Sequence, residues 1–232
     1  MSAEPTRSSA RTDRAAANRP RYRLNIEKLG QLSPEERSRL ADVTRKYAFR
    51  ANDYYLSLID WSDPNDPIRR LVIPHERELR QWGQLDASGE SKITVRKGVQ
   101  HKYRYTVLLL VNEVCGAFCR YCFRKRLFMN GNDESQYDLT PGLDYIREHS
   151  EVTNVLLTGG DPLILSTPRL DSIISALRAI DHVRVIRIGT KMPAFNPFRI
   201  LNDDSLLDTL RRHSHPDRRI YFMCHYDHPR EL

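Results

Sequence analysis

From residue 105 onward, short apolar runs alternate with stretches whose apolar residues recur at helical spacing. The runs are rich in Val, Leu and Ile, a composition that favours buried strands. The expected strands are Tyr105–Val111, Val152–Leu157, Val183–Ile188 and Ile220–Cys224. The expected helices are Pro141–Glu148, one that begins at Thr167-Pro168, and a short one over Ser205–Arg212. This alternation predicts an α/β fold with right-handed βαβ units and a parallel sheet.

The segment before this pattern is organised differently. Ser33-Pro34-Glu35-Glu36 has the form of a capping box with proline at the first helical position, which predicts a helix start. Residues 50–100 show no strong period and several turn signals, including Ser62-Asp63-Pro64-Asn65-Asp66-Pro67. We therefore expect three regions: a basic disordered tail over residues 1–30, a helical or irregular extension over 31–100, and the α/β unit over 101–232.

The expected sheet is incomplete by itself. Four strands are too few to close a parallel barrel, and a sheet that ends on a bare strand leaves one edge unpaired. The last expected strand, Ile220–Cys224, lies close to the end of the sequence. Either a second polypeptide or another copy of the chain completes the barrel, or the chain is part of a longer protein.

Composition excludes several classes of protein. Hydrophobic residues make up 40% of the 232 residues, enough for a core, yet no apolar stretch approaches the roughly 20 residues of a membrane helix. The polar N-terminus lacks the apolar segment of a secretory signal. We therefore expect a cytoplasmic protein without a membrane partner.

The net charge of +7 has a local source in the first 22 residues. This stretch contains two acidic residues, Glu4 and Asp13, and five arginines: Arg7, Arg11, Arg14, Arg19 and Arg21. A nucleic-acid-binding arm would favour aromatic residues between the arginines, and this stretch has none before Tyr22. We interpret the tail as a solvated segment and do not expect nucleic acid as a partner; a nucleic-acid-binding tail is the alternative.

Three cysteines directly follow the first expected strand. Cys115, Cys119 and Cys122 have the spacing Cys-x3-Cys-x2-Cys, at the end of a strand where barrel folds place their chemistry. Three thiolates on one loop can each bind one iron of a cubane cluster, which leaves the fourth iron open to a small molecule. Structural zinc, the alternative, would need a fourth ligand, and the region offers only His101 and His149.

Positive charge surrounds these cysteines, and a fourth cysteine lies far from them. Arg120, Arg124, Lys125 and Arg126 would lower the thiol pKa values and offset the negative charge of a cluster. We interpret Cys224 as a buried core thiol.

Thr158-Gly159-Gly160-Asp161-Pro162 follows the second expected strand. Two glycines at a strand end allow the backbone to present its N–H and C=O groups closely to a ligand. Taken alone, the motif favours a tight strand-to-helix turn over a ligand site.

Together the two motifs resemble the radical S-adenosylmethionine superfamily. The resemblance implies that Cys115, Cys119 and Cys122 hold a [4Fe–4S] cluster whose open iron chelates S-adenosylmethionine. It implies that Tyr121 lies near the adenine and that the backbone of Gly159, Gly160 and Asp161 holds the amino group. An ordinary half-buried loop tyrosine is the alternative for Tyr121.

Further stretches resemble the lysine 2,3-aminomutase family within that superfamily. They are Asp66-Pro67-Ile68-Arg69-Arg70 with Ile73-Pro74, His101-Lys102-Tyr103, Cys119 to Arg126, Arg187-Ile188-Gly189-Thr190, and His225-Tyr226-Asp227-His228-Pro229. The resemblance covers roughly residues 33–232. It implies a partial (β/α) barrel, S-adenosylmethionine and pyridoxal phosphate as cofactors, and an isomerase that moves an amino group on lysine or a related amino acid through an adenosyl radical.

The resemblance also carries individual roles to this sequence. Arg124 matches the arginine that pairs with the substrate carboxylate, a task suited to a planar bidentate donor; a solvated or cluster-stabilising arginine is the alternative. His225 is a candidate S-adenosylmethionine contact or a structural histidine. Tyr103 matches a tyrosine near pyridoxal phosphate, but Thr106 stands where the family has a phosphate-binding arginine.

The sequence departs from the family in its pyridoxal phosphate machinery. The family's Schiff-base lysine and substrate-gripping acids lie in a segment beyond Leu232, and we assign no catalytic pyridoxal phosphate lysine in this chain; Lys191 is only the nearest by location. Two alternatives stay open. One is a radical S-adenosylmethionine protein that acts on another substrate without pyridoxal phosphate. The other is an inactive fragment that binds an iron–sulfur cluster or zinc.

Overall fold

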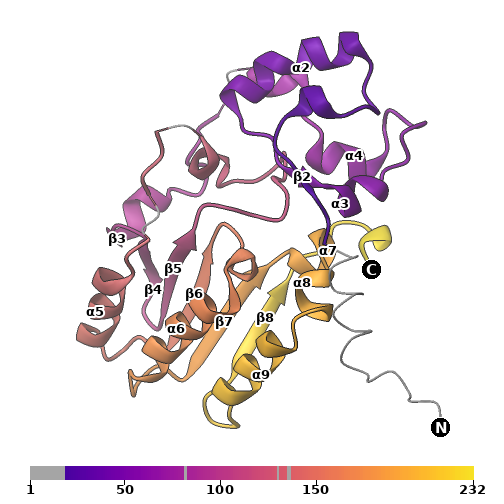
Figure 1. Ribbon diagram of the computed structural model, residues 1–232. Coiled ribbons are helices and arrows are strands. Elements are labelled where there is room, and N and C mark those ends of the chain that lie inside the picture. The colour runs from indigo at the N-terminus through magenta and orange to yellow at the C-terminus, as the bar shows by residue number, and fades with distance from the viewer. Residues whose placement is uncertain (1–18, 81–82, 130, 135–136) are drawn as a thin grey trace, which may run out of the picture.

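The computed structural model describes residues 19–232 except 81–82, 130 and 135–136 (Figure 1). Its main feature is a six-stranded sheet with the strand order β3-β4-β5-β6-β7-β8. The strands are β3 (Thr94–Arg96), β4 (Val99–Tyr103), β5 (Thr106–Asn112), β6 (Asn154–Gly159), β7 (Val185–Thr190) and β8 (Ile220–Cys224).

The four strands expected from the sequence are β5 to β8, and they pair in parallel. The prediction of an α/β fold with a parallel sheet is confirmed for these strands, whereas the partial barrel remains a prediction. The expectation of parallel strands only is wrong for β3 and β4, which pair antiparallel with each other and with β5. The chain reverses between β4 and β5 within a short turn, and so tight a connection joins antiparallel strands only.

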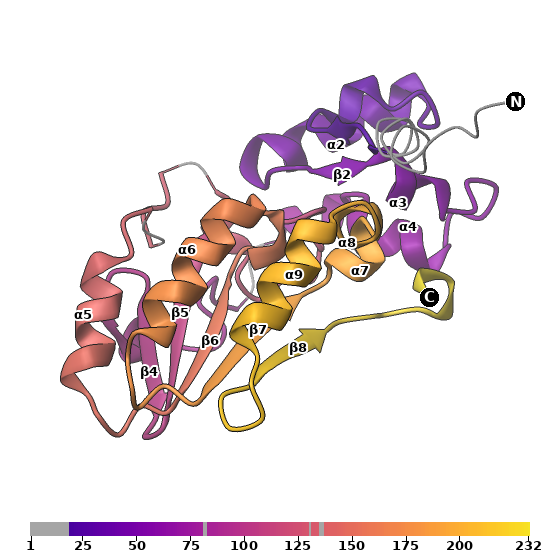
Figure 2. The ribbon, with the colours of Figure 1, turned by 60° about the horizontal axis from the view of Figure 1, so that its bottom comes forward.

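Three helices cover one face of the sheet: α5 (Thr140–Glu148), α6 (Thr167–Arg178) and α9 (Asp204–His213) (Figures 1 and 2). The side chains of β6 and β7 alternate between buried and half-buried positions. Val155 and Ile186 belong to the buried set and join the core together with Leu170 and Ile174 of α6. We call the opposite, half-buried side the inner face.

The N-terminal segment lies beyond the carboxyl ends of the parallel strands (Figure 1). It contains the short pair β1 (Tyr22–Arg23) and β2 (Ala51–Asn52), and the helices α2 (Pro34–Lys46), α3 (Asp53–Ser57) and α4 (Pro67–Val72). Ser33 caps α2 by accepting a hydrogen bond from the backbone N–H of Glu36. Ile26 and Leu29 are buried, so the expected tail boundary at residue 30 falls inside folded chain. Residues 1–18 of that tail lie outside the described residues.

Strand β8 forms one edge of the sheet. Two short helices, α7 (Met192–Phe195) and α8 (Phe198–Leu201), follow β7, and the chain ends in a 3-10 turn, Pro229–Glu231. Tyr221, Phe222 and Met223 of β8 are each about half exposed. Cys224 is exposed as well, so its interpretation as a buried core thiol is wrong. A buried position would require a neighbour beyond β8, and the described residues place none there.

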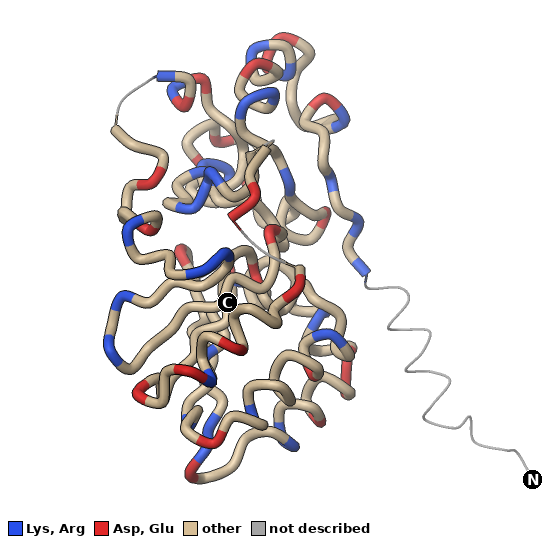
Figure 3. The backbone as a smooth tube through the Cα atoms, turned by 90° about the vertical axis from the view of Figure 1, so that its left-hand side faces the viewer, with Lys and Arg blue, Asp and Glu red and all other residues tan. Residues whose placement is uncertain are grey.

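None of the helices described is long and apolar enough to cross a membrane. Positive and negative residues are intermixed along the described backbone (Figure 3).

Candidate functional site

The cysteine loop begins directly after β5, at the carboxyl edge of the parallel strands, and the N-terminal segment holds its backbone. Arg50 donates from Nε to the carbonyl of Cys115 at 2.7 Å. The N–H of Phe118 donates to the carbonyl of Arg50 at 2.9 Å, and the N–H of Arg120 to that of Leu71 at 2.8 Å. The loop therefore lies between the sheet edge and the N-terminal segment, each of which fixes part of its path.

All four cations expected to serve the cysteines are paired with carboxylates: Arg124 and Arg126 with Glu90, and Arg120 and Lys125 with Glu78. Arg120 forms a bidentate pair with Glu78, at 3.1 and 2.7 Å, and Lys125 binds the same carboxylate. These side chains are largely buried, so the pairs attach the loop to residues that precede the sheet.

The three loop thiols are partly buried and free of disulfides. Burial raises the pKa of Cys119 to about 12 and raises the pKa values of Cys115 and Cys122 as well. The expectation that nearby cations lower these pKa values is wrong for the metal-free loop, because burial outweighs the attraction from Arg124 and Lys125 at Cys122. Metal binding would therefore release protons from all three sulfurs.

The thiols influence one another electrostatically, since the pKa of Cys115 is raised further by both Cys119 and Cys122. Among the described residues, however, no group of three or more His, Cys, Asp or Glu side chains is arranged to hold a single metal ion. A cubane distributes its protein ligands over different irons, so it does not require three sulfurs around one ion. The three thiols of the loop are the donor type that an iron–sulfur cluster takes.

The glycine motif lies against the same loop. Gly159 has a φ of +104°, and a Cβ there would stand 2.6 Å from the carbonyl oxygen of Asn112. A Cβ on Gly160 would stand 2.4 Å from the carbonyl oxygen of Val114. The N–H groups of Gly160 and Asp161 donate to those two carbonyls, at 2.7 and 2.8 Å. The glycines are thus required by the close approach of the β6 turn to the start of the cysteine loop.

The carboxylate of Asp161 is an internal anchor. It is 4% exposed and accepts hydrogen bonds from the Thr190 hydroxyl at 2.7 Å and from the N–H of Lys191 at 2.7 Å. Burial raises its pKa despite these bonds. The side chain joins the ends of β6 and β7, so any contact with a ligand would come from the backbone of this turn.

Tyr121 and His225, both expected near S-adenosylmethionine, lie side by side. The Tyr121 hydroxyl is 3.1 Å from His225 Nε2 and donates to Asp227 at 2.6 Å. His225 Nε2 is 2.9 Å from the other oxygen of Asp227. Burial raises the pKa of Tyr121, and the Cys119 thiol beside it raises it further. The structure therefore brings the end of β8 onto the cysteine loop.

Sequence reasoning did not identify Asp227 as the residue that joins these two. Lys191 donates to Asp227 at 2.7 Å and to Glu231 at 2.6 Å, and Glu231 also binds the hydroxyl of Tyr55. Burial opposes the charge on Asp227, but hydrogen bonds from Lys191, Tyr121 and His225 lower its pKa to about 2. Asp227 lies in the stretch His225–Pro229 that resembles the family, and this resemblance could have marked it as a site residue. Its partners could not be predicted, because Tyr121 and Lys191 are distant in sequence.

Arg124 is buried on the inner face and already paired. Its Nε and Nη2 donate to one oxygen of Glu90 at 2.9 and 2.7 Å, and its Nη1 donates to Thr158 at 2.6 Å. A substrate carboxylate would have to displace Glu90 to take the expected place. Glu90 lies 34 residues away at the start of the 3-10 helix Glu90–Ile93, and no sequence motif indicates this pair.

Tyr103 lies apart from the other expected site residues. It ends β4, pairs with Thr106 at the start of β5 and is 61% exposed. It therefore lies at the amino end of the parallel strands, opposite the cysteine loop.

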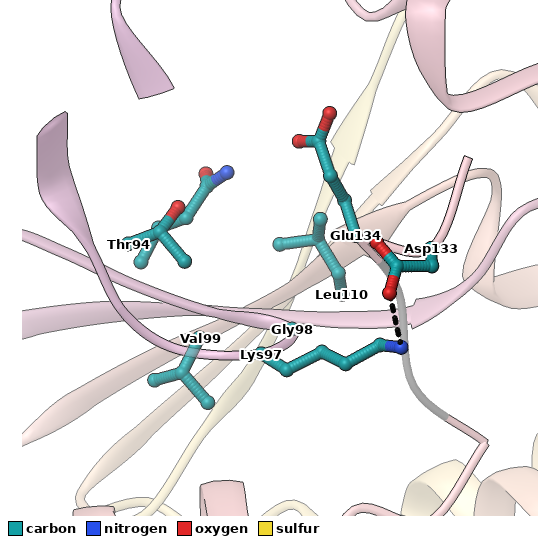
Figure 4. A pocket seen from close by; sticks show the side chains of 8 residues that line it. Thr94, Lys97, Gly98, Val99, Leu110, Asp133 and Glu134 are labelled. Carbon is teal, nitrogen blue, oxygen red and sulfur yellow. Dashed lines mark hydrogen bonds and ion pairs between the residues drawn. The ribbon is translucent and has the colours of Figure 1, made fainter. Parts of the chain in front are cut away.

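A cavity of about 270 Å³ lies between β3, the start of β4 and the loop after the cysteines. Lys97, Asp133, Glu134 and Leu110 are among its lining residues, and Lys97 pairs with Asp133 at 3.2 Å (Figure 4). None of the cysteines, glycines or other expected site residues lines it.

Comparison with known proteins gives relatives over most of the chain. A protein of Aquifex aeolicus (strain VF5), provisionally named an L-lysine 2,3-aminomutase, is 54% identical over 213 residues, which are 91% of this chain and 57% of the relative. The L-lysine 2,3-aminomutase of Clostridium subterminale is 35% identical over 89% of this chain and 49% of its own length. The glutamate 2,3-aminomutase of Clostridioides difficile (strain 630) is 33% identical over 89% and 48%. No protein-family profile matches.

The chain therefore spans about half the length of the curated relatives it matches. The chain has a parallel sheet with a three-cysteine loop at its carboxyl edge, and its relatives are aminomutases. These two findings place it among the α/β proteins related to aminomutases. Within this class, the chain belongs to the lysine 2,3-aminomutase family.

Proposed function

We propose that this chain is the radical-generating part of an isomerase that moves an amino group between adjacent carbons of lysine or a related amino acid. One observation carries the proposal: the cysteine loop and the Gly159-Gly160 turn are joined by backbone hydrogen bonds at the carboxyl edge of the parallel strands. A loop at this edge is where such sheets bind ligands. We propose a partial barrel for the whole α/β unit.

In this proposal, Cys115, Cys119 and Cys122 ligate a [4Fe–4S] cluster. When bound and reduced, the cluster supplies the electron that cleaves S-adenosylmethionine to an adenosyl radical. Tyr121 and His225, held by Asp227, form one wall beside the loop, and the Gly159–Asp161 backbone forms another. These residues bind and orient S-adenosylmethionine, and Arg50 keeps the loop backbone in position through the Cys115 carbonyl.

Pyridoxal phosphate is less well supported by the residues described. Lys191, the lysine beside the cysteine loop, is 7% exposed and bound to both Asp227 and Glu231, so it does not offer a free amine. Tyr103 is exposed at the far end of the strands, next to Thr106. We derive no step through pyridoxal phosphate from this chain.

That observation favours a second candidate function, a radical S-adenosylmethionine protein that acts on another substrate without pyridoxal phosphate. Visible absorbance after addition of pyridoxal phosphate, followed by borohydride trapping, separates the two. A trapped lysine adduct supports the aminomutase, and its absence in a protein that cleaves S-adenosylmethionine supports the second candidate.

The unpaired edge at β8 suggests how the sheet is extended. Tyr221, Phe222 and Met223 expose apolar surface beside a strand whose outer backbone groups have no neighbouring strand in the described sheet. We propose that a further polypeptide segment covers this edge, either from a second polypeptide or another copy of the chain, or from a longer protein of which this chain is a part.

The proposed function is tested with anaerobically reconstituted protein. We expect about four irons per chain and formation of 5′-deoxyadenosine after addition of dithionite and S-adenosylmethionine. Replacing Cys119 by Ser should remove the product to the level of a protein-free blank, since the cluster loses a ligand. Cys224→Ser is the matched control, because Cys224 is exposed on β8 and outside the loop.

Equal product formation by the Cys119→Ser and wild-type proteins would refute the proposal. Four irons per chain without any 5′-deoxyadenosine would indicate a non-catalytic iron–sulfur protein.

A further inference from the structure

The inner face of the parallel strands carries little charge. The register aligns Leu108, Leu156, Arg187 and Tyr221 in one row across β5 to β8. In the next row toward the cysteine loop, Leu110 pairs with Thr158, and Gly189 pairs with Met223. Thr106, Asn154 and Val185 form the row below. Arg187 is thus the one charged residue in these three rows, and none of the row positions is acidic.

Arg187 has unused donors. Its Nε donates to the side-chain oxygen of Asn154 at 3.0 Å, and no carboxylate among the described residues forms an ion pair with it. An arginine has five N–H donors in a planar fork that matches a carboxylate or a phosphate. The side chain is half-buried. A half-buried guanidinium with an amide as its side-chain partner favours an anionic ligand.

Arg124 provides the contrast on the same face. Its guanidinium contacts Glu90 through two nitrogens and Thr158 through the third. The charge of Arg124 is therefore neutralised within the protein, whereas that of Arg187 is not.

Gly189 leaves space beside Arg187. A Cβ at this position would meet Leu156 and the Leu157 carbonyl at 3.6 Å and the Thr158 hydroxyl at 3.9 Å, all ordinary contact distances. Its backbone also does not lie in the left-handed region. Packing and conformation therefore do not require glycine here, unlike at Gly159 and Gly160. A glycine in a strand interior without such a reason is typical of a place where a ligand approaches the backbone.

We infer that Arg187 binds the oxyanion of a ligand that lies along the inner face, across Gly189, toward the cysteine loop. Arg187 precedes the end of β7 by three residues, about 10 Å at the usual rise of a strand. The ligand would thus place its anionic group deep on the face and its remainder near the carboxyl edge. This inference rests on the proposed function and names the ligand class of the same site, a carboxylate or a phosphate ester.

Two pairs of probes test the inference and distinguish the sources of the oxyanion. The carboxylate pair is L-lysine and L-lysinamide; the phosphate pair is pyridoxal 5′-phosphate and pyridoxal. In one of the two pairs, we expect the probe that carries the carboxylate or phosphate to bind wild-type protein about 10- to 100-fold more tightly than its partner without that group, as charged hydrogen bonds allow. Arg187→Gln should abolish that ratio and Arg187→Lys should restore part of it. Arg219→Gln, on an exposed loop before β8, is the matched control.

A second variant addresses folding. Gly189→Ala should melt close to the wild-type temperature, because a Cβ there makes only ordinary contacts, and should weaken binding of the probe that carries the oxyanion. An unchanged ratio in Arg187→Gln for both pairs, or no binding of any probe to wild-type protein, would overturn the inference.

Failure of this inference can be distinguished from failure of the proposed function. Cleavage of S-adenosylmethionine by the wild-type protein is measured without these probes. Failure of one assay therefore leaves the other result standing.

Discussion

At the scale of single residues, Gly159 and Gly160 are required for a steric reason that goes beyond the formation of a tight turn. Both sites lie within 2.6 Å of backbone oxygens of residues 112–114 once a Cβ is added. From the sequence, the two glycines indicated that the backbone approaches a neighbouring group, such as a ligand, closely at this turn. The sequence could not indicate that the near neighbour is the start of the cysteine loop, because the two segments are more than forty residues apart.

Gly160→Ala should therefore destabilise the protein by about 2–3 kcal/mol, since the added methyl group meets the backbone of Val114, which cannot move away like a side chain. Urea unfolding at neutral pH measures the loss. Gly189→Ala is the control and should change the free energy of unfolding by less than about 1 kcal/mol. Equal unfolding midpoints for the two variants would contradict the steric explanation.

The roles of individual charged residues were harder to predict than their presence. Arg124 and His225 were named as candidates and Lys191 only as the nearest lysine by location, while their partners Glu90, Asp227 and Glu231 were not predicted. Arg124 and Glu90 are 34 residues apart, and Lys191 and Glu231 are 40 apart. Pairs of this kind depend on the tertiary fold, which local patterns do not contain.

At the scale of elements, periodicity predicted β5 to β8 and the helices α5, α6 and α9, because each strand is an apolar run and each of these helices buries one face, but it missed the short helices α7 and α8. It missed β3 and β4. Strand β4 reads Val-Gln-His-Lys-Tyr, in which only two residues are fully buried and the remaining positions are polar or exposed. The turn Arg104-Tyr105 that follows contains none of the Gly or Asn residues that mark a hairpin.

Helix α9 offers a test of element stability through its N-cap, Asp203. This carboxylate accepts hydrogen bonds from Leu206 N–H at 3.1 Å and from the Thr167 hydroxyl at 2.6 Å, and pairs with Arg199 at 2.6 Å. Burial opposes its charge, but hydrogen bonds from Ser205, Thr167 and Leu206, together with Arg199, outweigh burial and lower its pKa to about 2. Asp203 thus joins the starts of α6 and α9.

A pKa below the unfolded value means that the folded state binds fewer protons, so the stability from Asp203 is complete above about pH 4 and is lost as the pH falls toward 2. Asp203→Asn should cost about 1–2 kcal/mol at pH 6, a value reduced for partial exposure. The difference from wild type should shrink below pH 4. Urea unfolding at several pH values measures it, with Asp208→Asn as a control on the exposed side of the helix. A difference that stays constant from pH 6 to pH 3 would contradict this assignment.

At the scale of the whole molecule, the N-terminal segment and the C-terminal turn converge on the carboxyl edge of the sheet. Arg50 holds the cysteine loop from one side, while Asp227 and Glu231 hold Lys191 and Tyr121 from the other. Tyr55 of α3 completes the connection through Glu231. The sequence predicts that the loop binds a cluster, and that stays a prediction. It could not predict that residues before and after the sheet fix the loop jointly.

The central claim is that three sulfurs from this loop hold a cluster with one iron open to S-adenosylmethionine. Electron paramagnetic resonance of the reconstituted, dithionite-reduced protein tests it most directly, with spectra recorded before and after S-adenosylmethionine is added. We predict the signal of a reduced [4Fe–4S] cluster whose g values shift on addition, because the ligand binds the cluster itself. A cluster signal that stays unchanged at saturating S-adenosylmethionine, or no cluster signal at all, would contradict the account.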